Sequence, residues 1–339
     1  MKRSKKVASI LAAGSILTTL MAPALAAGLT DVNMSGWAER ELERADRLEL
    51  VTGRLGTDYT RAITRLEFAG LAVNCAEVFR GAPIDTGGMV FRDTADPVAG
   101  KAASAGIVKG TGDGSTFSPD RPITREEIAA MLDRTIGYMD VERIPAAGTL
   151  EEYKDRAALS SWAKPAMERM TGGGIMAGTD RGTLAPQENT SIEQAVALIF
   201  RTYRYMLQPD MTELAASFLK EEEMGRMAAL QKSYTDDASG FTDAKADALT
   251  LAEVYEKDGH TYLLYELRYR LKADRPDALV IFDEKVEDGW LLPAVPTVFV
   301  VEQKDGNAFS WLGGYQTEFT PDGYAEGYRM DFEAFLKEH

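Results

Sequence analysis

The chain has 339 residues, a formal net charge of −15, one cysteine and two histidines. This acidity argues against nucleic acid as a partner, and any anionic ligand has to be held by a local cluster of Arg or Lys. A single cysteine excludes an intramolecular disulfide. Two histidines far apart argue against a zinc site built on His, and no Gly-x-Ser-x-Gly element occurs. We therefore expect no metal, no cofactor and no catalytic residue.

The first 26 residues have the order of a secretory signal peptide. Four of the first six residues are basic, an apolar run follows, and Ala-Leu-Ala at 24–26 ends it. A retained membrane anchor, the alternative, needs about 20 apolar residues. Ser or Thr interrupts this run at four positions. We expect cleavage after Ala26, which leaves residues 27–339 as a secreted chain of net charge −19 with no integral membrane span.

One pattern occurs three times. "ITREEIA" at 123–129 matches "ITRLEFA" at 63–69, and "TSIEQAV" at 190–196 is a weaker copy. The copies are 60 and 67 residues apart, which is the size of a two-helix unit with a long loop. We therefore divide the first part of the chain into unit 1 (27–82), unit 2 (83–142) and unit 3 (143–208), the last of them degenerate.

The segment after each copy predicts a helix with one buried face. Apolar positions recur at the i, i+3, i+4, i+7 spacing of such a face. Matching positions are Phe68, Leu71, Ala72, Cys75, Ala76 and Phe79 in unit 1, Ile128, Met131, Leu132, Thr135, Ile136 and Met139 in unit 2, and Ala195, Leu198, Ile199, Thr202, Tyr203 and Met206 in unit 3. Cys75 is accordingly interpreted as a small core residue.

A first helix is expected upstream in each unit. Trp37-Ala38 precedes Gly53 by the same 16 residues that separate Trp162-Ala163 from Gly178, so both helices end in a Gly-containing turn. An aspartate precedes each unit, at Asp31, Asp93 and Asp155. Capping of the first helix is the favoured interpretation, and orientation of a ligand-binding side chain is the alternative.

Together, "FRDT", "GIVKGTGDGSTFSPDRPITREEIAAML", "WA" and "ITRLEFA" resemble the S-layer homology domain family over about residues 28–206. The resemblance implies a pseudo-trimer, mainly α-helical, with one helix of each repeat in a central bundle. It also implies grooves that bind an anionic, often pyruvate-bearing, secondary cell-wall polysaccharide on the bacterial surface.

A carboxylate-bearing glycan needs guanidinium donors, a backbone N–H exposed by glycine and a flat apolar surface. The helix dipole after the capping Thr64 and Thr124 also favours an anion. The candidate polysaccharide-binding residues are Arg65, Arg125, Lys109, Gly53, Gly110, Trp37, Trp162, Asp31, Asp93 and Asp155. Ile192 occupies the position of the arginine in unit 3, so we assign no binding role to that position.

Each candidate also has a simpler interpretation. The two Trp residues begin amphipathic helices and fit a core position, and the two Arg residues can pair with Glu67, Glu126 or Glu127 on their own helix. The loop at 110–120 carries Asp113, Ser115 and Asp120, but a calcium loop needs more carboxylates and a closing Glu. Asp-Gly followed by Ser and Pro is what a tight turn requires.

Residues 209–339 have a different composition and predict an α+β domain. We expect a helix at 211–233, a loop at 235–247, a hairpin with strands at 250–256 and 261–271, and further antiparallel strands within 278–292, 297–315 and 327–336. This layout is similar to cystatin-like or nuclear-transport-factor-like folds. Trp290, Trp311, Tyr265 and Tyr315 line a pocket or fill the core.

The sequence therefore predicts a non-catalytic, secreted bacterial surface protein. Three repeats anchor it to wall polysaccharide, and an α+β domain binds a ligand or partner. A small wall-anchored carbohydrate-active enzyme and an S-layer lattice subunit remain as alternatives.

Overall fold

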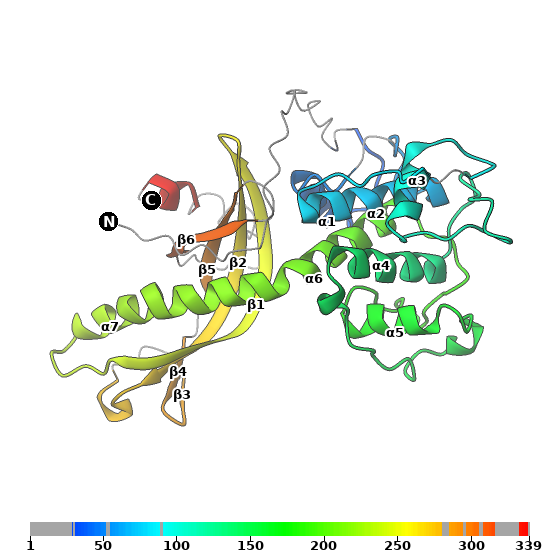
Figure 1. The fold of residues 1–339 in the computed structure, drawn as a ribbon. Helices are drawn as coiled ribbons and strands as arrows, with labels where there is room; N and C mark the ends of the chain where they lie inside the picture. The colour runs from blue at the N-terminus through cyan, green and yellow to red at the C-terminus, as the bar shows by residue number, and fades with distance from the viewer. Residues whose placement is uncertain are drawn as a thin grey trace.

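The structure is a computed structural model with a helical part and a β-sheet part (Figure 1). It describes residues 29, 31–51, 55–88, 91–279, 285–293, 296–304, 308–315 and 332–337. The predicted signal peptide and Gly53 lie outside the described residues. The helical N-terminal half and the antiparallel C-terminal sheet confirm the predicted fold class.

The helical part consists of three pairs of helices, one pair in each unit. The pairs are α1 (Glu39–Arg47) with α2 (Arg65–Arg80), α3 (Pro97–Ser104) with α4 (Arg125–Met139), and α5 (Lys164–Gly172) with α6 (Ile192–Phe218). Each second helix begins where the repeated motif places a capping box. Glu67 and Glu127 accept from the backbone nitrogens of Thr64 and Thr124, at 2.9 and 3.2 Å.

The three second helices pack against one another and form the core of this part (Figure 1). The predicted helix faces are confirmed, since all their residues except the half-buried Phe79 are at most 7% exposed. Each first helix packs on the second helix of the preceding unit: α3 on α2, α5 on α4, and α1 on α6. The three units therefore close into a ring.

Three backbone hydrogen bonds fix the centre of this ring. The nitrogen of Ile63 donates to the oxygen of Thr190 (2.9 Å), Thr190 donates to Ile123 (3.2 Å), and Ile123 donates to Ile63 (3.2 Å). All three residues are fully buried. The cycle uses one residue of each unit, so every unit holds the other two in place.

Helix α6 leaves the ring and runs on across the sheet. A π-helical turn at Leu219–Glu223 and α7 (Met224–Lys232) continue it without a break, so the boundary predicted at 209 falls inside a helix. Pro209 removes one backbone donor there. Arg143 donates to the carbonyl of Met206 and pairs with Asp210 at 2.9 Å, which stabilises the helix beside the proline.

The sheet is antiparallel, with strand order β3-β4-β2-β5-β6 and β1 paired with β2. The strands are β1 (Phe241–Lys257), β2 (His260–Ala273), β3 (Lys285–Glu287), β4 (Trp290–Leu292), β5 (Thr297–Gln303) and β6 (Phe309–Tyr315). The predicted hairpin and the alternation from Leu263 to Leu271 along β2 are confirmed. These alternate residues form the inner face, against which α6 packs, for example where Phe218 meets Phe299.

Two predictions for this part were wrong. Residues 241–247 belong to β1 and not to a loop, because β2 extends far enough to pair with them. Residues 332–336 form a short helix and not a strand. Phe332 and Phe335 of this helix pack on the outer face of the sheet, against Tyr262 and other buried side chains at one end.

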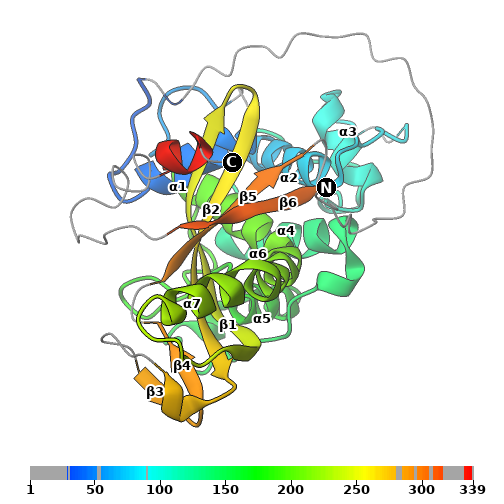
Figure 2. The ribbon, with the colours of Figure 1, turned by 90° about the vertical axis from the view of Figure 1, so that its left-hand side faces the viewer.

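The helical part also contacts the sheet directly, near the turn between β1 and β2 (Figure 2). Arg47 in the last turn of α1 donates to the carboxylate of Glu253 (3.0 Å) and to the carbonyl of Val254 (2.7 Å). Arg44 donates to the carbonyl of Ala252. The sheet is therefore attached to the helical part in two ways: it contacts the carboxyl end of α1, and α6 connects to it along the chain.

Candidate functional site

The second helix of each unit begins against the loop of the next unit. We call these contacts seam 1/2, seam 2/3 and seam 3/1. At every seam the backbone nitrogens of the first two helical residues donate to loop carbonyls at 2.9–3.0 Å: Arg65 to Arg121 and Leu66 to Pro119, Arg125 to Glu188 and Glu126 to Pro186, Ile192 to Arg61 and Glu193 to Tyr59. These amides are already used, so side chains have to supply the contacts of an anion bound at a seam.

Arg65 lies at seam 1/2 and is only 7% exposed. Its Nη2 donates to the carbonyl of Lys109 at 3.0 Å, and its guanidinium carbon lies 5.2 Å from the centre of the Phe117 ring. Its Nε has no hydrogen-bond partner among the described residues. Burial lowers the pKa of this guanidinium, although a nearby carboxylate, Glu127, acts in the opposite direction. Seam 1/2 thus holds a buried cation with an unused donor.

Arg125 occupies the equivalent place at seam 2/3. Its Nε donates to the carbonyl of Leu184 at 2.9 Å and its Nη2 to the carbonyl of Ala177 at 3.0 Å. Burial lowers the pKa of this guanidinium as well. Ala177 precedes Gly178 as Lys109 precedes Gly110, so the two guanidinium groups bind corresponding loop carbonyls.

Neither arginine pairs with a glutamate of its own helix, so that simpler interpretation was wrong. Glu67 pairs with Arg61 and Glu127 with Arg121, each at 2.6 Å. The helix glutamates are therefore neutralised by the arginines that precede the motif. Arg65 keeps a buried Nε donor that no described residue accepts from.

The glycine at the start of the loop allows a close backbone approach in units 2 and 3. A Cβ at Gly110 would lie 2.1 Å from the carbonyl oxygen of Gly114, and one at Gly178 would lie 2.5 Å from the Tyr153 ring. Glycine is therefore required to fold the loop and to aim the preceding carbonyl at the arginine. Lys109 itself presents an exposed side chain beside this turn.

The aspartates do not cap the first helices, and the favoured prediction was wrong. The Asp93 carboxylate accepts from the backbone nitrogens of Phe117 (2.8 Å) and Ser118 (2.7 Å), and these bonds lower its pKa. Asp155 accepts from Leu184 (2.7 Å) and Ala185 (2.8 Å) in the same way. Both aspartates fix the loop segment that lies against an arginine.

Unit 1 departs from this arrangement. Asp31 adopts a positive φ of 66°. Asn33 and Asp58 form the local link instead, through a 3.0 Å side-chain hydrogen bond and a β-bridge. The loop in unit 1 is shorter than in the other two units, so the contact made by Asp93 and Asp155 is replaced.

Trp37 and Trp162 are exposed, at 53% and 55%, so the core interpretation of these residues was wrong. Each begins a first helix that a buried glutamate of the preceding unit holds in place. Glu193 accepts from the nitrogen (2.8 Å) and hydroxyl (2.9 Å) of Ser35, two residues before Trp37. Both indole rings are thus presented to solvent on fixed backbone.

Sequence reasoning missed these carboxylate–serine pairs. Glu126 binds Ser160 as Glu193 binds Ser35, with the serine two residues before the tryptophan in both cases. At seam 1/2, Leu66 replaces the glutamate and Asp96 stands where the serine would be. A second carboxylate facing Asp96 would be repelled, so the two differences compensate each other. The paired occurrence of Leu66 in place of Glu and Asp96 in place of Ser was the sequence signal that could have revealed these contacts.

Seam 3/1 has no arginine at this position. Ile192 is fully buried in its place and supplies no donor side chain. Among the described residues, the seams therefore contain two matched guanidinium groups, and the exclusion of unit 3 from the predicted arginine set agrees with this geometry.

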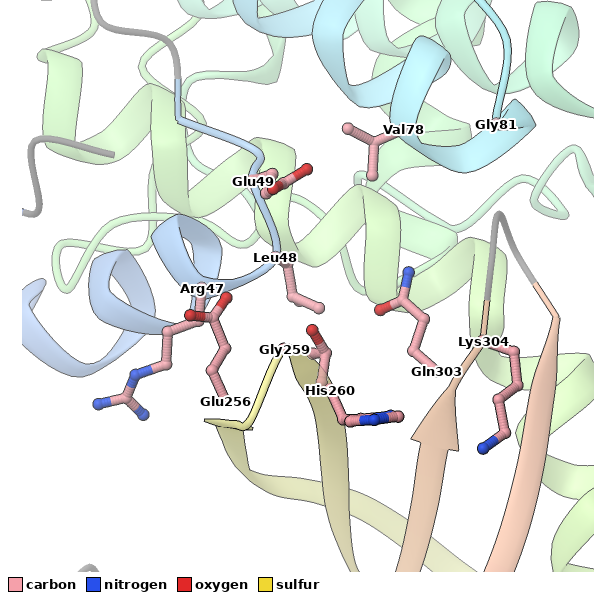
Figure 3. Close-up of a pocket in the computed structure, with 11 residues that line it drawn as sticks. Arg47, Leu48, Glu49, Val78, Gly81, Glu256, Gly259, His260, Gln303 and Lys304 are labelled. Carbon is pink, nitrogen blue, oxygen red and sulfur yellow. The ribbon is translucent and has the colours of Figure 1, made fainter. Parts of the chain in front are cut away.

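A separate cavity of about 510 Å³ lies between the helical part and the β1–β2 turn (Figure 3). It is lined by Arg47, Leu48 and Glu49 after α1, Val78 and Gly81 at the end of α2, and Glu256, Gly259, His260, Thr261, Gln303 and Lys304 of the sheet. Its cationic side chains pair with carboxylates outside the lining: Arg47 with Glu253 at 3.0 Å, and Lys304 with Glu302, whose carboxylate also lies 2.7 Å from His260 Nδ1. The cavity is at the opposite end of α2 from Arg65.

The helical part is thus a closed ring of helix-loop-helix units with two matched arginine sites. Residues 94–129 and 152–196 match the S-layer homology domain family, and these segments contain Arg125, Asp155 and Trp162. Units 2 and 3 therefore contain segments similar to the S-layer homology domain family, as the motifs predicted.

Relatives of the chain include both surface proteins and enzymes. The surface-layer 125 kDa protein of Lysinibacillus sphaericus is 25% identical over 186 residues, which is 53% of this chain and 15% of the relative. Cell surface glycoprotein 1 of Acetivibrio thermocellus is 34% identical over 104 residues, 30% of this chain and 4% of the relative. An endoglucanase of Bacillus sp. (strain KSM-635) is 25% identical over 215 residues, 58% of this chain and 22% of the relative.

The chain spans less than a quarter of the length of these relatives. The match to the endoglucanase covers its S-layer homology region and not its enzymatic part. The family and the surface relatives place the chain at the cell surface. No helix within the described ranges is long and apolar enough to cross a membrane.

Proposed function

We propose that the helical part holds the protein on an anionic, pyruvate-bearing secondary cell-wall polysaccharide, and that seams 1/2 and 2/3 are the binding grooves. Unit 1 acts as a third S-layer homology repeat. Unit 3 contributes its loop to seam 2/3, but Ile192 replaces the motif arginine at the start of its own second helix. The sheet part is a non-catalytic domain that binds a ligand or partner.

The equivalent placement of Arg65 and Arg125 is the observation that carries this proposal. Each guanidinium is bound to the carbonyl before a loop glycine, which fixes its orientation. A guanidinium recognises a carboxylate through paired N–H donors, and partial burial strengthens that contact. Pyruvate joined to a sugar as a ketal offers such a carboxylate.

At seam 2/3 the exposed Trp162 supplies the second element of glycan recognition. An indole face packs against the apolar face of a sugar ring, and side chains held on fixed backbone lose little entropy on binding. Trp162 follows the Ser160–Glu126 contact, and Glu126 is adjacent to Arg125 in the sequence. A ring face and a guanidinium thus belong to the same seam.

Sedimentation with purified wall sacculi tests the proposal. We expect the protein without its first 26 residues to sediment with sacculi, and to remain in solution after mild acid has removed acid-labile ketals. Arg125→Ala should reduce retention, and Arg65→Ala with Arg125→Ala should abolish it. Arg80→Ala, an exposed arginine at the other end of α2, is the matched control. Unchanged retention of the double variant would overturn the assignment of the grooves.

A further inference from the structure

The outer face of the sheet carries an aromatic residue surrounded by cations. Trp290 of β4 is half-buried. The Nζ of Lys245 lies 5.0 Å from the centre of its ring, and Lys272 Nζ and the guanidinium carbon of Arg270 each lie 5.4 Å away. We call Lys245, Arg268, Arg270, Lys272 and Trp290 the Trp290 cluster.

Strand register places these residues on one face. Lys245 is opposite Arg270 in the β1–β2 pair, and Lys272 is opposite Trp290 in the β2–β4 pair. Arg268, Arg270 and Lys272 are alternate residues of β2, so they share a face. Tyr269 and Leu271 between them are buried against the helix side. The Trp290 cluster therefore points away from α6 and α7.

The described helix at 332–337 covers only the other end of this face. In both ribbon views it lies at the end of the sheet opposite β3 and β4 (Figures 1 and 2). Its buried contacts are with residues such as Tyr262 and Leu264, well along β2 from Lys272. Within the described ranges, the face around Trp290 has no packed helix.

The positive charges of the cluster are only partly neutralised. Arg270 pairs with Asp247 at 3.0 Å, and Lys272 donates to the backbone carbonyl of Asp288, which carries no net charge. Lys245 and Arg268 are exposed, and no ion pair joins either of them to another described residue. Asp247 beside Arg270 and Glu287 opposite Trp290 offset part of the positive charge. A bound anion would pair with the part that remains.

We propose that the Trp290 cluster binds an anionic polysaccharide. The cations match its carboxylates or phosphates, in a chain whose net charge is −15 and therefore repels anions elsewhere. A membrane surface fits less well, because none of the large apolar side chains that are exposed among the described residues lies in a strand. This inference gives a ligand class to the sheet part and rests on its proposed role as a binding domain.

Binding to immobilised polygalacturonate at low salt tests the inference in the full chain. The starting protein carries Arg65→Ala and Arg125→Ala, so that any binding comes from outside the seams. In that background Lys245→Glu should weaken binding about three- to tenfold, and addition of Arg268→Glu should abolish it. Lys164→Glu on α5, also an exposed position and with the same charge change, should have no effect. Thermal unfolding verifies that each variant is folded.

Other outcomes separate this inference from the proposed function. Equal binding by the Lys245→Glu and Lys164→Glu variants would overturn it, and so would binding to phosphatidylglycerol vesicles but not to polygalacturonate. Loss of polygalacturonate binding in the Arg65→Ala, Arg125→Ala protein would also overturn it while leaving the grooves supported. Neutral dextran should not bind any variant. Retention on sacculi that depends on Arg125 but not on Lys245 tests the grooves alone.

Discussion

The carboxylate of Glu126 accepts hydrogen bonds from both the backbone nitrogen and the hydroxyl of Ser160, at 3.0 and 2.8 Å. Glu126 is 4% exposed and lies in the first turn of α4 in unit 2, whereas Ser160 lies four residues before α5 in unit 3. Glu193 and Ser35 repeat the contact between units 3 and 1. Two buried carboxylates thus join neighbouring units of the ring.

Removal of this carboxylate should destabilise the helical part. Glu126→Ala leaves the Ser160 donors unsatisfied, and we expect a loss of about 2–3 kcal/mol in the free energy of unfolding, measured in urea. Glu126→Gln keeps one acceptor and should lose less. A double-mutant cycle with Ser160→Ala should give a coupling energy above about 0.5 kcal/mol. Strictly additive effects would show that the pair does not join the units.

Asp93 should make the stability of the protein vary with pH in the acidic range. Its pKa is lowered in the folded protein by the amides of Phe117 and Ser118, relative to an unfolded value of about 4. The stabilisation is therefore complete above that unfolded value and is lost as the pH falls through the lower folded value. Asp93→Asn should reduce the urea midpoint at pH 7 and flatten its fall between pH 5 and pH 2. An unchanged pH profile would contradict this.

The exposed indoles should affect binding more than stability. Trp37→Ala and Trp162→Ala remove side chains that are more than half exposed, so each should change the free energy of unfolding by less than about 0.5 kcal/mol. Retention on sacculi should fall for Trp162→Ala, which lies at seam 2/3. A loss of about 3–5 kcal/mol, the usual effect of truncating a core tryptophan, would restore the core interpretation.

Cys75 should report on the integrity of the central bundle. It is fully buried, and burial raises the pKa of its thiol to about 12. We expect no reaction with a thiol reagent at pH 8 in native protein and rapid reaction in urea, followed by absorbance. The reaction should appear at the same urea concentration as the loss of helical circular dichroism. Reaction in the absence of urea would mean that α2 opens locally.

Local patterns were sufficient to predict much of the fold. The second helices follow from apolar spacing and a capping motif, which act within one turn, and the hairpin follows from the alternation along β2. Residues 241–247 were missed because Ala, Asp and Lys are poor strand formers, and only pairing with β2 makes them a strand. The boundary at 209 was placed where the repeat pattern ends, and the sequence pattern did not show that α6 continues through Pro209 to Phe218.

The arginines of the seams were predictable from repetition, but their contacts were not. The carbonyls that Arg65 and Arg125 bind lie 44 and 52 residues or more away, in the next unit. The role of Asp155 likewise depends on amides 29 residues later. Such partners are brought together by ring closure, which no local pattern encodes.

The continuous helix from Ile192 to Lys232 joins the ring to the sheet part and fixes the distance over which the two extend. At 1.5 Å per residue it is about 60 Å long. The seams lie at the amino ends of α2 and α4, whereas Arg47 attaches the sheet at the carboxyl end of α1. On a wall that engages the seams, every copy would therefore carry its sheet domain at the same elevation and facing outward.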